Sequence, residues 1–250
     1  MYASSKDPNL KKGKGCLGAT MADPVGATFD EVYNDTSLYY VVWNDQFYQD
    51  PKIRGCCDSC GSPWGHSKGM VVWNDAGEGF VLQVTTPSWP AAGSTQFPRE
   101  SDGNTLGCVR DNDVKVSQHF FALRLTKDDL VKVLRALQNA SVVTDPTNSQ
   151  IVHNGGLEGV KSLVSGLGVK SRSKSATKET LSGGVILLSK SAGLHVPPWQ
   201  MVSTLLGTVP LRAATWWNRS KIYSTTGGTS ISCWDNRLAK PGAVEIAVTG

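Results

Sequence analysis

Short runs of apolar residues recur along the chain, separated by polar stretches rich in glycine, proline, asparagine and aspartate. Most of these runs are continuous rather than alternating, which is typical of strands that are covered on both faces. The turn-forming segment Asn74–Gly79 separates two of them and predicts a β-hairpin with a longer loop. We therefore expect strands near Leu38–Trp43, Met70–Trp73, Phe80–Val84, Phe120–Leu125, Val185–Leu188, Ala213–Trp217 and Val244–Val248.

Two segments have the period of an amphipathic helix. The clearer one follows Thr126, which stands three residues before Asp129, a spacing close to that of a capping box at a helix start. A second helix is predicted to begin at Pro197-Pro198 and to end before Gly207. The apolar positions of the first helix fall on one face and are Leu130, Val133, Leu134 and Leu137. Helices between covered strands favour an α/β fold.

The composition is that of a folded globular protein. The chain has 250 residues, of which 40% are hydrophobic and 18% are charged, with a formal net charge of +4. This content excludes a disordered chain, and no apolar run reaches the ~18 residues that a membrane-spanning helix needs. The small positive charge permits a polyanionic partner without requiring one. The first residues lack the apolar stretch of a signal peptide.

Cysteines and glycosylation sequons favour an oxidising, secretory compartment. The sequons begin at Asn34, Asn139 and Asn218. Cys57 and Cys60 form a C-x-x-C pair, which could be half of a zinc site or a redox pair. The pair lies in a glycine- and proline-rich loop without a second pair, so disulfides or free thiols are favoured. The six cysteines are Cys16, Cys56, Cys57, Cys60, Cys108 and Cys233.

A turn-rich stretch over residues 143–156 is the best candidate for a boundary within the chain. A basic run in a serine- and glycine-rich setting follows it. Such a run is either a solvated loop, which we favour, or an arm that contacts phosphates. Its residues are Lys161, Lys170, Arg172, Lys174 and Lys178.

Among the four histidines, His66 has the most suggestive surroundings. It belongs to the segment Gly65-His66-Ser67-Lys68-Gly69, which leads into an apolar strand. Residues i and i+2 of an extended chain point the same way, so the imidazole and the ammonium would lie side by side. This pairing suits phosphate chemistry, because the lysine can bind a non-bridging oxygen while the imidazole attacks phosphorus or moves a proton. The alternative is an edge-strand histidine beside a solvated lysine.

A second candidate cluster is Asn44-Asp45-Gln46, at the end of the strand expected over Leu38–Trp43. Binding sites of layered α/β folds lie at the carboxyl ends of strands. The same three residues could equally form an Asx-type turn without a functional role. We find no Walker loop, G-x-S-x-G elbow or G-x-G-x-x-G fingerprint in the chain.

Five short motifs occur in a fixed order between Leu38 and Val109. They are Asn44-Asp45-Gln46, Gly65-His66-Ser67-Lys68-Gly69, Gly79-Phe80, Pro87-Ser88-Trp89-Pro90 and Leu106-Gly107-Cys108-Val109. Their order and spacing resemble those of the deoxyribonuclease II family, and thinner similarity continues through residues 181–188 and 214–216. Five ordered landmarks are a much more specific signal than one His-x-Lys.

The resemblance implies a phospholipase D-like α/β fold, in which two similar mixed-sheet halves pack as a pseudodimer. The halves would be residues 1–145, which carry His-x-Lys, and residues 146–250. It implies an endonuclease that hydrolyses DNA phosphodiesters at acidic pH without a metal or other cofactor, through a phosphohistidine, leaving 3′-phosphate ends. His66 and Lys68 match the catalytic motif, and Asn44, Asp45 and Gln46 match the landmark that we assign to substrate binding. Family members work in lysosomes or outside the cell.

The chain departs from the family pattern in two places. None of His119, His153 and His195 has a lysine two residues later, so a second His-x-Lys is missing, and Val84 stands where the family has a further histidine. We therefore expect a chain truncated at both ends, with weak or no cleavage, unless a homodimer pairs two copies of the motif. The alternatives are a DNA-binding paralogue that does not cut, and a cysteine-rich interaction domain whose His-x-Lys is accidental.

Overall fold

A five-stranded antiparallel sheet forms the centre of the computed structural model, which describes residues 1–13, 24–47, 52–53, 56, 59–86, 118–215 and 236–248. The strand order is β6-β5-β4-β3-β7, so strands that follow one another in sequence mostly pair directly. Four of the five were predicted from the apolar runs. The strands are β3 (Tyr39–Asn44), β4 (Lys68–Trp73), β5 (Gly79–Val84), β6 (Phe120–Leu125) and β7 (Val152–His153).

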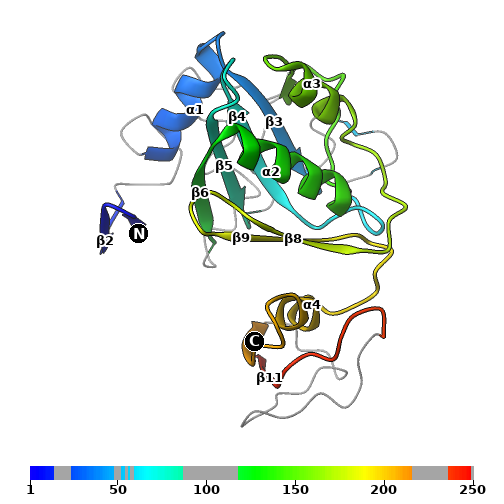
Figure 1. Cartoon of the computed structure of the whole chain (residues 1–250). Helices are drawn as coiled ribbons and strands as arrows, with labels where there is room; N and C mark the ends of the chain where they lie inside the picture. The colour runs from blue at the N-terminus through cyan, green and yellow to red at the C-terminus, as the bar shows by residue number, and fades with distance from the viewer. Residues whose placement is uncertain are drawn as a thin grey trace.

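The two central strands explain why the apolar runs are continuous. All six residues of β4 are buried, as are all residues of β3 except Tyr39, which is half-buried. Helix α2 (Lys127–Ala140) crosses one face of the sheet, as Figure 1 shows. Helix α1 (Pro24–Asn34) contributes Phe29 and Val32 to the same apolar core. A strand with cover on both faces has no polar side to alternate with.

Helix α2 begins where the sequence predicts. The Thr126 hydroxyl accepts a hydrogen bond from the backbone N–H of Asp129 at 3.3 Å, and the Asp129 carboxylate accepts one from the backbone N–H of Thr126, also at 3.3 Å. This reciprocal pair is a capping box. The same carboxylate accepts a bond of 2.8 Å from the backbone N–H of Ser182 and so ties the following hairpin to the start of the helix.

The hairpin of β8 (Ala176–Thr180) and β9 (Ile186–Lys190) lies along α2 (Figure 1). The Asn139 side chain donates to the Ser189 hydroxyl at 2.8 Å, which fixes the far end of the helix to β9. Helix α3 (Glu158–Ser165) also contacts α2. The main core therefore includes side chains from beyond residue 145, such as Val160 and Leu181.

A second, smaller apolar cluster forms in the C-terminal part of the chain. Leu194, Val196 and Met201 are its buried residues, the last of them on α4 (Pro198–Leu205), the helix predicted from Pro197-Pro198. The parallel pair β10 (Leu211–Thr215) and β11 (Val244–Val248) contacts α4. At the N-terminus, β1 (Tyr2–Ser4) and β2 (Asp7–Lys11) form a separate hairpin.

These elements confirm the α/β class. The division into residues 1–145 and 146–250, and the pseudodimer of two similar halves, stay predictions. In the described part of the second segment, β7, α3 and the β8–β9 hairpin contact the first. No helix in the described part of the chain is long and apolar enough to cross a bilayer.

The capping box generates a stability prediction. Thr126→Ala removes the hydroxyl that satisfies the Asp129 N–H and should lower the free energy of unfolding by about 1 kcal/mol. Thr126→Ser keeps the hydroxyl and should stay close to wild type. Urea unfolding of the three proteins measures the difference, and equal losses in both variants would contradict a capping role.

Candidate functional site

The candidate site lies at the edge of the sheet where β3 ends and β4 begins. The antiparallel register places Asn44 opposite Lys68, so the chain just beyond β3 lies next to the chain just before β4. Asp45 and His66 therefore meet, although 21 positions separate them in the sequence. Strand pairing, rather than closeness in sequence, assembles the site.

One carboxylate binds both residues of the His-x-Lys motif. Oδ2 of Asp45 lies 2.6 Å from Nδ1 of His66, and Oδ1 of Asp45 accepts a hydrogen bond from Nζ of Lys68 at 2.9 Å. The imidazole and the ammonium thus lie on the same side of the chain, as the extended spacing predicts. The three side chains form a His66–Asp45–Lys68 triad.

The members of the triad differ sharply in exposure. The side chains of Asp45 and Lys68 are 2% and 3% exposed, whereas that of His66 is 80% exposed. Asp45 and Lys68 therefore form a buried ion pair, and the imidazole is presented to solvent. Because Nδ1 of His66 is engaged by the carboxylate, Nε2 is the ring nitrogen that remains to react.

The partners of Asp45 stabilise its ionised form. Burial alone would raise the pKa of the Asp45 carboxyl, but the hydrogen bonds from His66 and Lys68, with the attraction of the lysine charge, outweigh burial and hold that pKa below its ordinary value of 3.8. The carboxylate therefore stays ionised in mildly acidic solution, which keeps the hydrogen bond to His66 in place.

Two glycines fit the motif closely against its surroundings. A methyl group on Gly65 would collide with the carbonyl of Ala140 at the end of α2, and one on Gly69 would collide with the Trp43 ring and the Leu82 carbonyl. The Gly65 N–H donates to the Ser141 carbonyl at 3.0 Å. The glycines on both sides of His-x-Lys are thus explained by close backbone packing, which holds the loop of His66 to α2.

A disulfide supports the other side of the site. Cys56 is bonded to Cys60, whose backbone N–H donates to the Asp45 carbonyl at 2.8 Å. The expectation of a disulfide in this loop is confirmed, and Cys60 has no thiolate left for zinc. The partner is Cys56 rather than the C-x-x-C neighbour Cys57, which lies outside the described residues together with Cys16, Cys108 and Cys233.

One residue of the predicted substrate-binding cluster, Asn44, has a structural role. The Asn44 side-chain oxygen accepts a hydrogen bond from the Gln46 N–H at 2.8 Å, which is an Asx-type turn, the alternative considered from the sequence. Asn44 is fully buried, and its side-chain nitrogen has no hydrogen-bond partner among the described residues. The contacts of Asp45 indicate that it orients the His66 ring. Binding of substrate by Asn44, Asp45 and Gln46 stays a prediction.

Of the other sequence landmarks, Val84 and His119 lie near this edge, whereas His153 lies near the start of β3. Val84, which replaces a family histidine, pairs directly with Lys68 across β4 and β5 and is buried. The His119 carbonyl accepts from the Thr85 N–H at 3.1 Å, and the His119 N–H donates to the Thr85 hydroxyl at 2.9 Å. His153 lies on β7, where Nδ1 contacts the Leu38 carbonyl at 2.7 Å. The motifs at residues 87–90 and 106–109 lie outside the described part of the structure.

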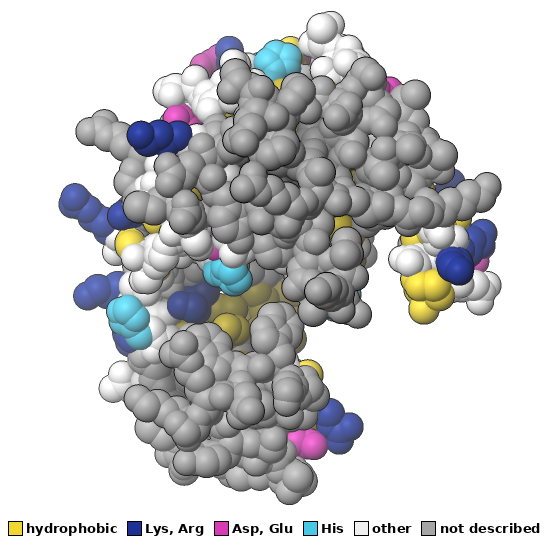
Figure 2. All heavy atoms as spheres, turned by 180° about the vertical axis from the view of Figure 1, so that it is seen from behind, with side chains coloured by type: hydrophobic (Ala, Val, Ile, Leu, Met, Phe, Trp, Pro, Cys, Tyr) yellow, Lys and Arg dark blue, Asp and Glu magenta, His cyan; other side chains and the backbone are white. Residues whose placement is uncertain are grey.

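The face seen in Figure 2 carries Lys, Arg and His side chains along one side, next to an indentation of the surface. Within the described ranges, no three His, Cys, Asp or Glu side chains lie close enough to share a metal ion.

A model of the deoxyribonuclease II family matches residues 1–230 of the chain. The chain belongs to the deoxyribonuclease II family. Membership in this family supports a hydrolase of the deoxyribonuclease type, with DNA as its substrate class. A comparison with curated proteins finds no match.

The buried ion pair predicts a non-additive stability effect. Asp45→Asn leaves the Lys68 ammonium buried without a carboxylate, which should cost about 3–5 kcal/mol of unfolding free energy. The double variant Asp45→Asn/Lys68→Met should lose less than Asp45→Asn alone, because no unpaired charge remains. Urea unfolding at neutral pH tests this, and a double variant that loses the sum of the two single losses would contradict the pairing.

The low pKa of Asp45 predicts the pH range of this stabilisation. A carboxyl whose pKa is lower in the folded than in the unfolded state stabilises the fold above its unfolded pKa, here 3.8, and the effect is lost as pH falls through the folded value. The difference in unfolding free energy between wild type and Asp45→Asn should be at its full value near pH 5 and shrink below about pH 4. A difference that grows on acidification would contradict the assignment.

Proposed function

We propose that this protein is an acid endodeoxyribonuclease that cleaves DNA phosphodiester bonds without a metal ion, through a phosphohistidine on His66. The observation that carries the proposal is the 2.6 Å contact between the buried Asp45 carboxylate and Nδ1 of the exposed His66. A carboxylate that holds one ring nitrogen fixes the tautomer and the orientation of the imidazole, so that the other nitrogen can act on substrate.

The first step forms one bond and breaks one. The lone pair of His66 Nε2 attacks the phosphorus of a phosphodiester, the P–N bond forms, and the bond from phosphorus to the 5′-oxygen breaks. The leaving 5′-oxygen takes its proton from a second, protonated imidazole, which in a homodimer would be the His66 of the other copy. Water then attacks phosphorus, the P–N bond breaks, and a 3′-phosphate is released. Asp45 stabilises the positive charge that develops on the His66 ring.

Lys68 acts chiefly through Asp45 in this arrangement. Its ammonium is 3% exposed and 2.9 Å from Oδ1 of Asp45, so it neutralises and positions the carboxylate that orients His66. We assign Lys68 as a positioning residue. Direct binding of a phosphate oxygen by Lys68, which the sequence suggested, would require the lysine to become more exposed than it is here.

An acidic working range fits these charges. The pKa of Asp45 lies below 3.8, so the carboxylate remains charged where a histidine of ordinary pKa, ~6.5, is already protonated. At about pH 5 the orienting carboxylate and the proton-donating imidazole are therefore both in the required state, and the attack proceeds from the molecules in which Nε2 of His66 carries no proton. Raising the pH removes the proton of the acid partner, and the rate falls.

A DNA-binding paralogue that does not cut is the alternative function. Val84 favours it, because an apolar side chain lies directly beside Lys68 where the family has a histidine. The missing second His-x-Lys points the same way and suggests that cleavage by this chain is weak. The two functions share DNA binding and differ only in bond cleavage, so an assay of cleavage separates them.

We infer a lysosomal or extracellular location from the family and from the disulfide between Cys56 and Cys60, since stable disulfides belong to oxidising compartments. The two sequon asparagines in the described residues differ. Asn34 is exposed at the end of α1, where its side chain donates to Asp30 at 2.9 Å, whereas Asn139 is half-buried and its side chain donates to Ser189. Asn34 is therefore the better glycosylation candidate.

The decisive variant is His66→Ala, assayed by nicking of supercoiled plasmid at about pH 5 in EDTA with protein in excess. Loss of the nucleophile should lower the cleavage rate by about 10³-fold or more. Because Lys68 still pairs with Asp45, the loss of stability should be smaller than that of Asp45→Asn. His195→Ala, another exposed histidine, is the matched control and should cleave like wild type.

The wild-type rate should peak below pH 6. Full activity of His66→Ala, abolition of wild-type cleavage by EDTA, or a rate that persists at pH 8 would contradict the proposal. Salt-dependent DNA binding without any nicking would support the paralogue.

A further inference from the structure

The basic run noted in the sequence contains an ordered, two-sided segment. Residues 170–174 precede β8, and their side chains alternate between exposed and half-buried. The exposed positions are all cationic and the half-buried ones are serines. This alternation is what an extended chain gives, since successive side chains point to opposite sides. We call Lys170, Arg172 and Lys174 the basic strip.

The serine side anchors the strip to the fold. The Ser171 N–H donates to the Ser141 hydroxyl at 2.8 Å, and the Ser173 N–H donates to the Ser171 hydroxyl at 3.1 Å. The Ser175 carbonyl accepts from the Ser191 N–H at 3.2 Å, where β8 and β9 begin to pair. The bonds to Ser141 and Ser191 hold the two ends of the segment to the fold, and the bond between Ser173 and Ser171 shapes it locally, so its backbone presents the three cations on one side.

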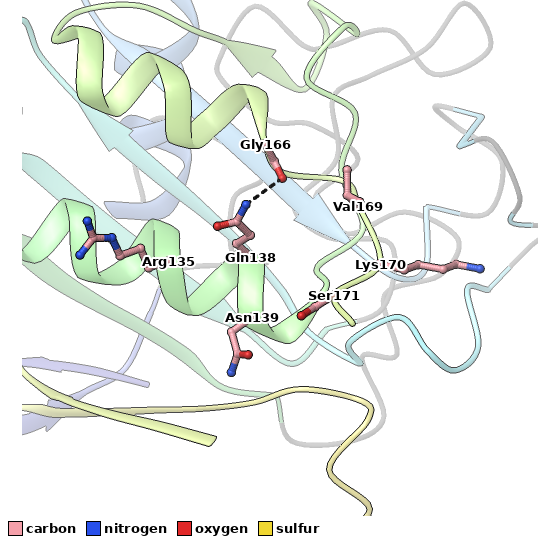
Figure 3. Close-up of a pocket in the computed structure, with 7 residues that line it drawn as sticks. All are labelled: Arg135, Gln138, Asn139, Gly166, Val169, Lys170 and Ser171. Carbon is pink, nitrogen blue, oxygen red and sulfur yellow. Dashed lines mark hydrogen bonds between the residues drawn. The ribbon is translucent and has the colours of Figure 1, made fainter. Parts of the chain in front are cut away.

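Ser141 connects the strip to the His66 loop. Its carbonyl accepts from the Gly65 N–H at 3.0 Å while its hydroxyl accepts from the Ser171 N–H at 2.8 Å. On the neighbouring side, Nζ of Lys170 lies 5.3 Å from the centre of the Trp64 ring, a cation–π contact. In Figure 3, Lys170 extends away from α2, while Ser171 lies beside the end of that helix. The strip therefore starts beside Trp64 and Gly65, the residues that precede the candidate nucleophile.

The three positive charges of the strip are not neutralised by carboxylates in the described residues. Every ion pair found among the described residues involves other cations, and no carboxylate there pairs with Lys170, Arg172 or Lys174. A pocket of about 350 Å³ borders the start of the strip and adds one more cation, Arg135 of α2, as well as Gln138. The charge of Lys68, by contrast, is neutralised by the buried ion pair with Asp45. The strip thus carries unpaired positive charge that a polyanion can reach, joined through Ser141 to the loop of His66.

We propose that the basic strip is a binding surface for the DNA backbone, on which successive phosphates leading away from the scissile bond contact Lys170, Arg172 and Lys174. This inference rests on the proposed function. Alternate residues of an extended chain are about 6.5 Å apart, a spacing comparable to that of neighbouring phosphates along one strand. Contacts of this kind carry affinity and register without sequence preference.

The test measures how DNA affinity depends on salt in the full chain carrying His66→Ala, so that no substrate is consumed. The probe is a short fluorescein-labelled DNA duplex, followed by anisotropy at about pH 5 in EDTA over a salt series. Each phosphate contact contributes about 0.9 to the slope of log affinity against log salt on duplex DNA. Lys170→Ser/Arg172→Ser/Lys174→Ser should therefore lower the slope by about 2.7.

The matched control removes three exposed lysines from other surfaces. Lys6→Ser/Lys12→Ser/Lys127→Ser changes the net charge by the same amount, and none of these lysines has an ion-pair partner in the described residues. This control should keep the slope of the parent. Circular dichroism checks that each triple variant is folded. If the strip triple is unfolded, the single variant Arg172→Ser replaces it, and its slope of log affinity against log salt should be lower by about 0.9.

The outcomes separate the two proposals. Equal slopes for the strip triple and the parent, equal losses in strip and control triples, or no salt-dependent DNA binding by the parent would overturn the strip as a DNA surface. Binding of the parent to anionic lipid vesicles but not to DNA would also overturn it. A reduced slope together with full nicking by His66→Ala would retain the strip and reject the catalytic assignment.

Discussion

The structure around the candidate site depends on one buried carboxylate. Asp45 lies at the end of a strand that is covered on both faces, where an unpaired charge would be very costly. Two cationic or proton-donating groups, from Lys68 and His66, meet its two oxygens. The pairing in turn fixes the only exposed member of the triad, His66, with Nδ1 held inward. Burial thus supplies the orientation that a surface histidine would otherwise lack.

The central part of the fold could be predicted from the sequence because its signals are local. Continuous apolar runs located β3 to β6, and the Thr126–Asp129 spacing located the start of α2. The placement of His66 and Lys68 on one side also followed from the geometry of an extended chain. β7 was missed because two residues are too few to give a periodic signal.

The role of Asp45 could not be predicted in the same way. In sequence it belongs to Asn44-Asp45-Gln46, where an Asx turn and a binding site are equally consistent, and the structure contains that turn. Its contact with His66 depends on the β3–β4 register, which local patterns do not give. The burial of Lys68 was unexpected for the same reason, since the lysine is neutralised by a residue from another strand. The pairing of Cys56 with Cys60 likewise required the folded loop.

The arrangement divides two tasks among the cations. Lys68 is buried and maintains the orientation of the imidazole, while the exposed basic strip provides charge that a polyanion can reach. Composition alone could not distinguish this strip from a solvated loop, because both are rich in lysine and serine. The distinction depends on Ser141, which we assign no catalytic role. It accepts hydrogen bonds from the backbone N–H groups of Gly65, in the His66 loop, and of Ser171, in the strip.

The most direct test of His66 as the nucleophile is to trap the covalent intermediate. The protein is mixed with an oligonucleotide at about pH 5, and the reaction is quenched with alkali, in which phosphohistidine survives. The protein is then digested, and its peptides are examined by mass spectrometry. We expect a nucleotide attached to the peptide that contains His66. Cleavage accompanied by a nucleotide on another residue, with His66 unmodified, would contradict it.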